Sequence, residues 1–166
     1  EPHASIAFWE GPKVTLYSSN QSVHYLQYHI ARVFGMPMGN VRVLKTHVGG
    51  GFGGKLDPTG LDFAAVRLSQ ITGRPVKMAF DRKEMFYNNR GRHAQYMELT
   101  TGVTKEGKIL GVHANFVMDG GAYTGLGVAS AYYAGALLTV LYDFDNYKFD
   151  MIRVVTNLPG CGAQRG

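Results

Sequence analysis

The sequence predicts an α+β fold in which a mixed β-sheet packs against helices. Segments with alternating apolar residues, typical of strands, occur along the whole chain. Between them lie segments in which apolar residues recur every three or four positions, as they do in helices. The composition, with 45% hydrophobic and 17% charged residues, is that of a globular chain rather than a disordered one. No internal repeat and no linker interrupts this mixture of elements.

The first elements are a hairpin and a helix. Residues 4–10 and 13–19 alternate as strands do and flank a Gly-Pro turn. The period then changes, and the spacing predicts a helix over residues 21–34. Its apolar positions are Val23, Leu26, Ile30 and Val33, with Ser19 or Asn20 as the cap and Gly35 at the end.

A second strand-and-helix pair follows. Residues 40–46 are strand-like, and the glycine-rich segment "GGGFGG" comes directly after them. Asp57 and Pro58 are start signals for a second helix that ends at Gly73. Its expected apolar positions are Leu61, Ala64, Ala65, Leu68 and Ile71.

The rest of the chain predicts further strands. We expect a strand at 76–80, a short helix or turn at 81–88, a hairpin over 95–120 and a last strand over 148–157. Residues 120–142 carry no charge but contain several glycines and tyrosines, which favours a buried segment over a membrane span.

Charge and cysteine content exclude several classes of protein. The net charge of +5 is spread along the chain, and its one cluster, Arg90, Arg92 and His93, indicates a solvated basic surface rather than a nucleic-acid site. The six histidines lack zinc spacing, so no metal held by protein side chains is expected. The single cysteine, Cys161, excludes an internal disulfide and fits a reducing, cytoplasmic compartment.

The ends of the sequence indicate a piece of a longer protein. The chain begins with "EPHAS", without an initiator methionine, and ends in "GAQRG". We therefore expect residues 1–166 to be a single, partial domain. A non-catalytic fragment that associates with itself through exposed strand edges remains one alternative.

The glycine-rich segment is the strongest functional signal. Fixing a glycine costs roughly 0.5–1 kcal/mol more than fixing an alanine, so such density indicates that something approaches the main chain closely. Gly49, Gly51 and Gly54 fit the G-x-G-x-x-G motif, and Asp81 stands where a ribose-binding acid would be expected. An NAD(P)-dependent Rossmann-type oxidoreductase therefore remains an alternative.

Both phosphate-binding interpretations of the glycines, the P-loop and the dinucleotide motif, meet an objection. The P-loop pattern fails at Leu56, where a hydroxyl is needed for magnesium. Asp57 and Pro58 begin a new helix beyond the glycines, so these do not form a strand-to-helix turn. We therefore expect a freestanding loop whose backbone N–H groups receive the oxygens of a bulky cofactor. A flexible surface loop is the remaining alternative.

The phrase "VGGGFGGK" resembles the glycine loop of the xanthine oxidase family of molybdenum hydroxylases, in the large subunit that binds molybdopterin. "EPHAS", "GMPMGNVRV", "DRKEMF", "GRHA", "DGGAY" and "TNLPGCGAQRG" agree in the same order, so the resemblance covers essentially the whole chain. Within the family, "GAYTGLG", "GALL" and "LPGCGAQRG" are similar to the 4-hydroxybenzoyl-CoA reductase large subunit.

The resemblance implies roles for particular residues. Gln21 matches a glutamine that donates a hydrogen bond to an oxo ligand of the molybdenum, which a neutral amide can do without adding charge. Gly50, Gly51, Phe52 and Gly53 should lie against the metal end of the cofactor. Arg165 matches an arginine near the cofactor and the substrate. Catalytic roles are thus implied for Gln21 and Arg165.

Departures from the family limit what the chain should do. Leu56 replaces a glutamate of the purine-oxidising members, and Cys161 is not where carbon monoxide dehydrogenases hold copper, because Gly166 follows Arg165. The catalytic glutamate of the family lies beyond this segment, so the isolated segment should be inactive.

The resemblance also implies a cofactor and partners. The cofactor is molybdopterin, with the cytosine dinucleotide form as one alternative. Iron–sulfur clusters and FAD should lie on other domains or subunits, since one cysteine cannot hold a cluster. The partners are the remainder of the large subunit, these other subunits and a small aromatic, heteroaromatic or acyl-CoA substrate.

Overall fold

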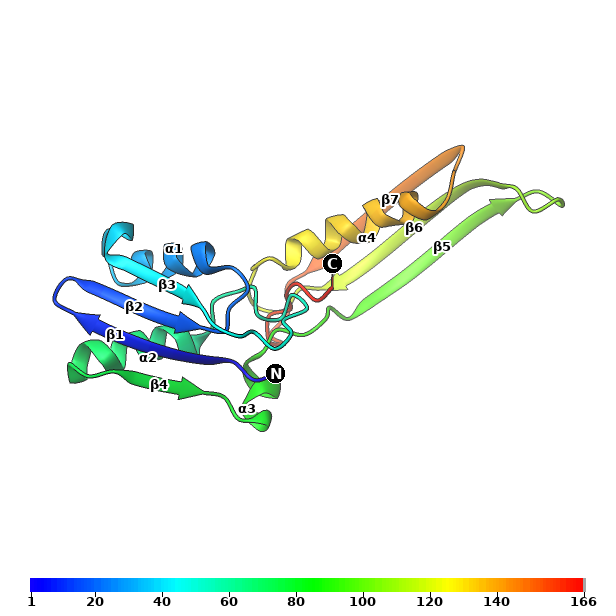
Figure 1. The fold of residues 1–166 in the computed structure, drawn as a ribbon. Coiled ribbons are helices and arrows are strands. Elements are labelled where there is room, and N and C mark those ends of the chain that lie inside the picture. The colour runs from blue at the N-terminus through cyan, green and yellow to red at the C-terminus, as the bar shows by residue number, and fades with distance from the viewer. Residues whose placement is uncertain (166) are drawn as a thin grey trace. The chain divides into compact units, whose positions relative to one another are not determined.

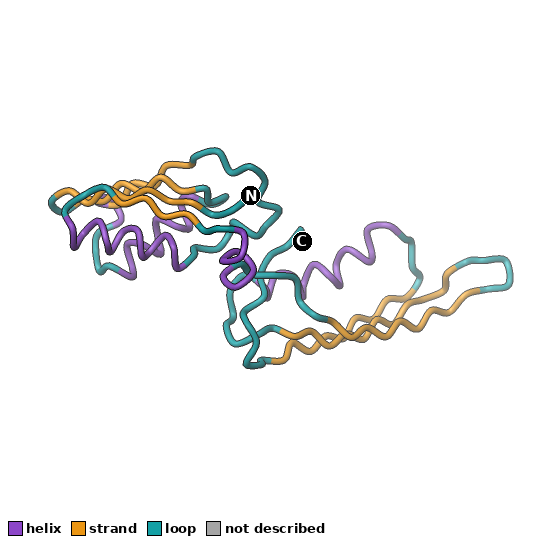
Figure 2. The backbone as a smooth tube through the Cα atoms, turned by 90° about the horizontal axis from the view of Figure 1, so that it is seen from below, coloured by secondary structure: helices purple, strands orange, loops and turns teal. Residues whose placement is uncertain are grey.

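The computed structural model describes residues 1–165. The chain divides into two compact units, with the boundary between Asn89 and Arg90. Each unit has its own sheet, as Figures 1 and 2 show. The α+β class with mixed sheets is confirmed.

The first unit is built on a four-stranded sheet in the order β3-β2-β1-β4. Strands β1 (Ala4–Glu10) and β2 (Lys13–Ser18) form the predicted antiparallel hairpin. Strand β3 (Val41–Lys45) runs parallel to β2, and β4 (Val76–Ala79) runs antiparallel to β1 at the opposite edge. The sheet is therefore mixed.

Two helices cover one face of this sheet (Figure 2). They are α1 (Val23–Val33) and α2 (Gly60–Thr72); a short turn of 3-10 helix, η1 (Met38–Asn40), precedes β3. Because side chains alternate along a strand, every second residue of β1 and β2 points into this layer. The fully or nearly fully buried core residues are Ala7, Val14, Leu16, Leu26, Ile30, Ala31, Val41, Ala65 and Val66.

A buried carboxylate joins α2 to the hairpin. Asp62 is 2% exposed, and its Oδ1 accepts hydrogen bonds from the hydroxyls of Ser5 at 2.5 Å and Ser18 at 2.8 Å. Its Oδ2 accepts from the backbone N–H and the hydroxyl of Thr59, at 3.0 and 2.9 Å. Buried charge is tolerated only when hydrogen-bonded, and here four donors surround it.

Both predicted helices exist, but their starts and faces differ from the prediction. Helix α2 starts at Gly60 after Thr59, because the Asp62 carboxylate binds Thr59 there, and not at Asp57 and Pro58. The side chain of Asn20 does not cap α1, since it accepts from the N–H of Ser22 and donates to the carbonyl of Asp57. Both helices end at glycines as predicted, Gly35 and Gly73, each with a φ of 62°.

Some expected core positions of these helices are exposed. Val33, Leu68 and Ile71 are 61%, 42% and 65% exposed. The buried face of α2 instead includes Asp62 and Ser69, because polar side chains bond to the strands there. Helix α3 (Arg82–Asn88) completes the unit.

The second unit has a three-stranded sheet in the order β5-β6-β7. Strands β5 (Gln95–Val103) and β6 (Ile109–Asp119) form the predicted hairpin, and β7 (Asn146–Val154) runs parallel to β6. Helix α4 (Gly127–Leu141) connects β6 to β7 and lies along the sheet (Figure 1).

The uncharged stretch 120–142 is not the buried segment that the sequence predicts. Of the residues of α4, Gly127 and Gly135 are buried, whereas Tyr132, Val140 and Leu141 are 73%, 71% and 79% exposed. The helix faces a sheet of three strands along one side, so apolar composition alone cannot bury the rest of its circumference. Within residues 1–165, no helix has the length and apolar character needed to cross a membrane.

Candidate functional site

The glycine loop leaves the end of β3 in a conformation that few residues adopt. The values of φ are 68° at Gly49, 102° at Gly50, 50° at Phe52 and 91° at Gly53. L-residues rarely adopt these angles, so the glycines are required by the backbone itself. Phe52 is the exception, and such strain in a side-chain-bearing residue is typical of functional loops.

The side chain of Gln21 holds this loop through hydrogen bonds to its backbone. Its side-chain oxygen, Oε1, accepts hydrogen bonds from the backbone N–H groups of Gly53 at 3.0 Å and Lys55 at 3.2 Å. The backbone N–H of Gln21 donates to the backbone carbonyl of Lys55 at 2.8 Å. Because both side-chain partners are donors, the atom facing them must be the amide oxygen. The amide NH₂ group of Gln21 then donates to no acceptor within residues 1–165.

The loop leaves no room for side chains on its Gln21 side. A Cβ atom at Gly51 would stand 2.7 Å from Cγ of Gln21, which is closer than real contacts allow. A Cβ atom at Gly50 would lie 3.0 Å from the ring of Phe52. The main chain, Gln21 and Phe52 are therefore packed so tightly that only glycine fits between them.

Two buried basic side chains, Lys55 and His3, lie close to each other, and Lys55 holds the loop. Lys55 is 3% exposed, and its ammonium group donates to the carbonyl of Val48 at 2.5 Å. His3 is 4% exposed, and its Nδ1 lies 3.2 Å from Sδ of Met85. Burial lowers the pKa of Lys55, with Glu1 acting in the opposite direction, and burial followed by the Lys55 charge lowers the pKa of His3. No periodicity in the sequence predicts that Lys55 and His3 are buried.

The opposite side of the loop is open. Phe52 is 57% exposed, and Gly49 and Gly50 are exposed as well. The loop thus presents bare main chain and one aromatic ring outward, while Gln21 and Lys55 hold it from within. This arrangement suits a large, flat ligand that lies against the backbone.

Arg165 belongs to the second unit, at the end of the segment that follows β7. Asp119 anchors this segment: its Oδ1 accepts from the N–H of Gly121 at 2.9 Å and from the hydroxyl of Thr156 at 2.7 Å, and these bonds lower its pKa. Arg153 donates to the carbonyl of Gly120 at 2.7 Å. Arg165 itself is exposed and has a φ of 65°.

The predicted site residues therefore fall into two groups. Gln21 lies against Gly51 and Gly53 in the first unit, next to Gly50 and Phe52, although 32 residues separate Gln21 from Gly53. Arg165 lies in the other unit. Cys161 is half-buried, and burial raises its pKa.

The dinucleotide-binding alternative is not favoured by this geometry. The strand that follows α2 is β4, at the far edge of the sheet from β3, so the glycine loop does not begin a unit of two adjacent parallel strands. Asp81 is the N-cap of α3: its side chain accepts from the N–H of Glu84 at 2.7 Å, and Glu84 accepts from its N–H at 2.8 Å. The capping box therefore accounts for an acidic residue at position 81 without a role in binding a ribose.

Comparison with known proteins identifies the chain. A family model described as the molybdopterin cofactor-binding domain matches residues 1–166. The chain belongs to this family. Together with the relatives below, the match makes it a molybdopterin-binding domain of the xanthine oxidase family of molybdenum hydroxylases.

Curated relatives of this molybdopterin cofactor-binding domain are subunits of molybdenum enzymes. The chain is 35% identical over 167 residues to the xanthine dehydrogenase molybdenum-binding subunit of Escherichia coli O157:H7, covering 100% of the chain and 22% of that relative. It is 34% identical to the nicotinate dehydrogenase large molybdopterin subunit of Eubacterium barkeri, covering 100% of the chain and 39% of that relative. The chain thus spans well under half the length of these relatives.

Solved structures have the same fold. The quinoline 2-oxidoreductase of Pseudomonas putida 86 matches with a TM-score of 0.84 at 27% identity, over 100% of this chain and 22% of the other. The CO dehydrogenase of Oligotropha carboxidovorans matches with a TM-score of 0.85 at 24% identity, over 99% of this chain and 21% of the other. The latter likeness concerns the fold alone.

The residues around the glycine loop fit a molybdopterin cofactor. The loop offers bare main chain, and the Gln21 amide offers a neutral donor that residues 1–165 leave without an acceptor. Across that same stretch, no group of three or more histidine, cysteine, aspartate or glutamate residues is arranged to hold a metal ion.

Proposed function

We propose that this molybdopterin-binding domain holds the metal end of its cofactor with Gln21 and the loop Gly50, Gly51, Phe52 and Gly53. The observation that carries the proposal is that the oxygen and the NH₂ group of the Gln21 amide have different hydrogen-bonding states. Its oxygen accepts from the N–H of Gly53 at 3.0 Å, and its NH₂ group donates to no acceptor within residues 1–165. An amide fixed in this way meets an acceptor without rotating, so binding does not carry the entropic cost of ordering this side chain.

The chain's own contributions are binding and orientation. Gln21 would direct a neutral hydrogen bond at an oxygen of the bound group, and Phe52 would cover its flat side. Arg165 is proposed to bind an oxyanion or a carbonyl, because the fork of N–H donors in a guanidinium matches such oxygens. When bound, the molybdenum cofactor supplies the redox chemistry.

We propose that the intact enzyme oxidises or reduces an aromatic, heteroaromatic or acyl-CoA substrate. The phrases "GAYTGLG", "GALL" and "LPGCGAQRG" support a relationship to the 4-hydroxybenzoyl-CoA reductase large subunit, and Leu56 argues against a purine. Residues 1–166 would then be part of one cofactor-binding domain of a larger, cytoplasmic subunit, inactive by itself.

The cofactor form and the partners complete the proposal. The proposed cofactor is molybdopterin, and its cytosine dinucleotide form is one alternative. Iron–sulfur and FAD groups would reside on other domains or subunits, because Cys161 is the single cysteine of the chain.

The test is cofactor retention in a glycine-loop variant. Gly51→Val should abolish molybdenum retention, since its side chain would displace Gln21, whose Cγ lies 2.7 Å from the Cβ position. Gly39→Val is the matched control, because a Cβ atom there meets nothing within 4 Å. Molybdenum per protein is measured by mass spectrometry after purification. Normal molybdenum content in Gly51→Val would refute the proposed site.

A further inference from the structure

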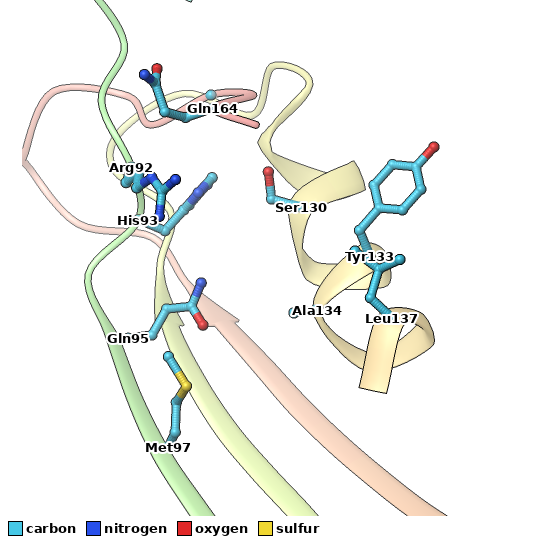
Figure 3. Close-up of a pocket in the computed structure, with 10 residues that line it drawn as sticks. Arg92, His93, Gln95, Met97, Ser130, Tyr133, Ala134, Leu137 and Gln164 are labelled. Carbon is cyan, nitrogen blue, oxygen red and sulfur yellow. The ribbon is translucent and has the colours of Figure 1, made fainter. Parts of the chain in front are cut away.

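A cavity of about 280 Å³ lies within the second unit, between the start of β5 and helix α4 (Figure 3). The residues that form its walls recur with the spacing expected for a strand and for a helix. From the β5 side come residues two positions apart, and from α4 come residues three or four positions apart, so each element contributes one face. The lining residues are Arg92, His93, Gln95, Met97, Ser130, Tyr133, Ala134, Leu137, Gly162 and Gln164.

The cavity exists because α4 is fastened over the opposite edge of the sheet. A Cβ atom at Gly135 would stand 2.9 Å from Cγ of Phe149, so the helix backbone lies directly on β7. The hydroxyl of Tyr147, also on β7, donates to the carbonyl of Gly135 at 2.8 Å. Since β7 and β5 are the two edges of the sheet, the space above β5 stays unfilled.

One end of the cavity is polar and its hydrogen-bonding groups are unused. The side chains of Arg92, Gln95, Ser130 and Gln164 make no hydrogen bond or ion pair within residues 1–165. The Oε1 atom of Gln164 is fully buried in that state. Arg92 is exposed and Gln95 and Ser130 are half-buried, so their donor groups are available to a ligand that enters the cavity.

The charge of this end comes from Arg92. Burial, and then the charge of Arg153, lowers the pKa of His93, so its imidazole is neutral at pH 7. No carboxylate lines the cavity. The lining also has an apolar part, made by Met97, Ala134 and Leu137, and in Figure 3 Ala134 lies on the side of α4 that faces the strands.

We propose that this cavity binds a small monocarboxylic acid, with its carboxylate on Arg92 and its apolar body against Met97 and Leu137. A guanidinium matches a carboxylate in shape and charge. One arginine balances one negative charge, which disfavours a phosphate dianion. The volume is at the small end of ligand sites, about 300–1,000 Å³, and so admits a body of about one ring. The site uses residues of the second unit alone and does not depend on the proposed cofactor contacts.

The test is a calorimetric titration of the protein with benzoate, with neutral benzamide as the matched ligand. Benzoate should bind with a dissociation constant of about 1 mM or tighter, and benzamide at least about tenfold more weakly. Arg92→Gln should weaken benzoate binding at least about tenfold, whereas Lys105→Gln, which removes an equal charge from the exposed β5–β6 turn, should leave it unchanged.

A second variant addresses the apolar part. Ala134→Leu fills the cavity while Arg92 remains, and it should also weaken benzoate binding; circular dichroism verifies that each variant is folded. Equal binding of benzoate and benzamide, equal binding by wild type and Arg92→Gln, or no binding by the wild type would each overturn the proposal. None of these outcomes bears on molybdenum retention.

Discussion

The ammonium group of Lys55 donates a hydrogen bond to the backbone carbonyl of Val48 at 2.5 Å, and so joins the two ends of the glycine loop. Every glycine of "GGGFGG" lies between these two residues. A flexible segment is thereby closed into a ring by one side chain. The order of the loop should consequently depend on Lys55 more than on any glycine contact.

Lys55→Met keeps the length of the side chain and removes the donor. We expect the backbone amides of residues 49–54 to exchange with solvent roughly tenfold faster, because a hydrogen bond from a charged donor contributes about 1.5–3 kcal/mol. Hydrogen exchange followed by mass spectrometry measures this. Lys45→Met, at an exposed position on β3, is the control. Unchanged exchange in Lys55→Met would mean that the loop is held by Gln21 alone.

Asp62 should be the most sensitive polar position of the first unit. Asp62→Ala leaves the hydroxyls of Ser5, Ser18 and Thr59 without their acceptor, and we expect the free energy of unfolding to fall by about 3 kcal/mol or more. Urea unfolding measures the loss, with Glu10→Ala at an exposed strand end as the control. A loss below about 1 kcal/mol would show that these bonds contribute little net stability.

His3 predicts a pH dependence of stability. Its pKa in the folded chain lies below the usual 6.5, because it is buried and faces the charge of Lys55. As the pH falls through 6.5, the unfolded chain binds a proton that the folded chain does not. The free energy of unfolding must therefore decrease as the pH falls from 6.5 toward the lower, folded-state pKa.

The difference between two variants isolates this effect. In His3→Leu, the free energy of unfolding should vary less with pH below 6.5 than in the wild type or in the exposed-site control His24→Leu. Urea unfolding at a series of pH values gives the slopes. Identical slopes in all three proteins would mean that His3 takes up its proton equally well in both states.

The sequence predicts the helices and strands better than it predicts which of their residues are buried. Strand alternation, helical spacing and the two helix-ending glycines, Gly35 and Gly73, are local signals, and the structure has those elements. Burial is not local: Ile71 and α4 are apolar in sequence yet exposed, because a three-dimensional neighbour is needed to cover them. The role of Asp62 was missed for the same reason, since its partners Ser5 and Ser18 lie 57 and 44 residues away.

In the candidate site, too, some features are predicted by local sequence and others depend on the fold. The density of glycine marks the loop without any alignment, because positive φ angles demand that residue. Gln21 is predicted by the family resemblance and not by its own spacing, and no sequence pattern predicts the role of Lys55. The hydrogen bond between Gln21 and Gly53 depends on the fold bringing the start of α1 beside the loop, and the bond between Lys55 and Val48 depends on the shape of the loop itself.

The most direct test separates the two ends of the Gln21 amide. Gln21→Glu keeps an oxygen for the N–H groups of Gly53 and Lys55 but has no NH₂ group to donate. Hydrogen exchange verifies that the loop is intact, and molybdenum per protein is then measured by mass spectrometry. Our account predicts an ordered loop with molybdenum retention reduced at least about tenfold, the loss expected for one charged or strongly polar hydrogen bond. Full molybdenum retention by Gln21→Glu would contradict the assignment of that amide to the cofactor.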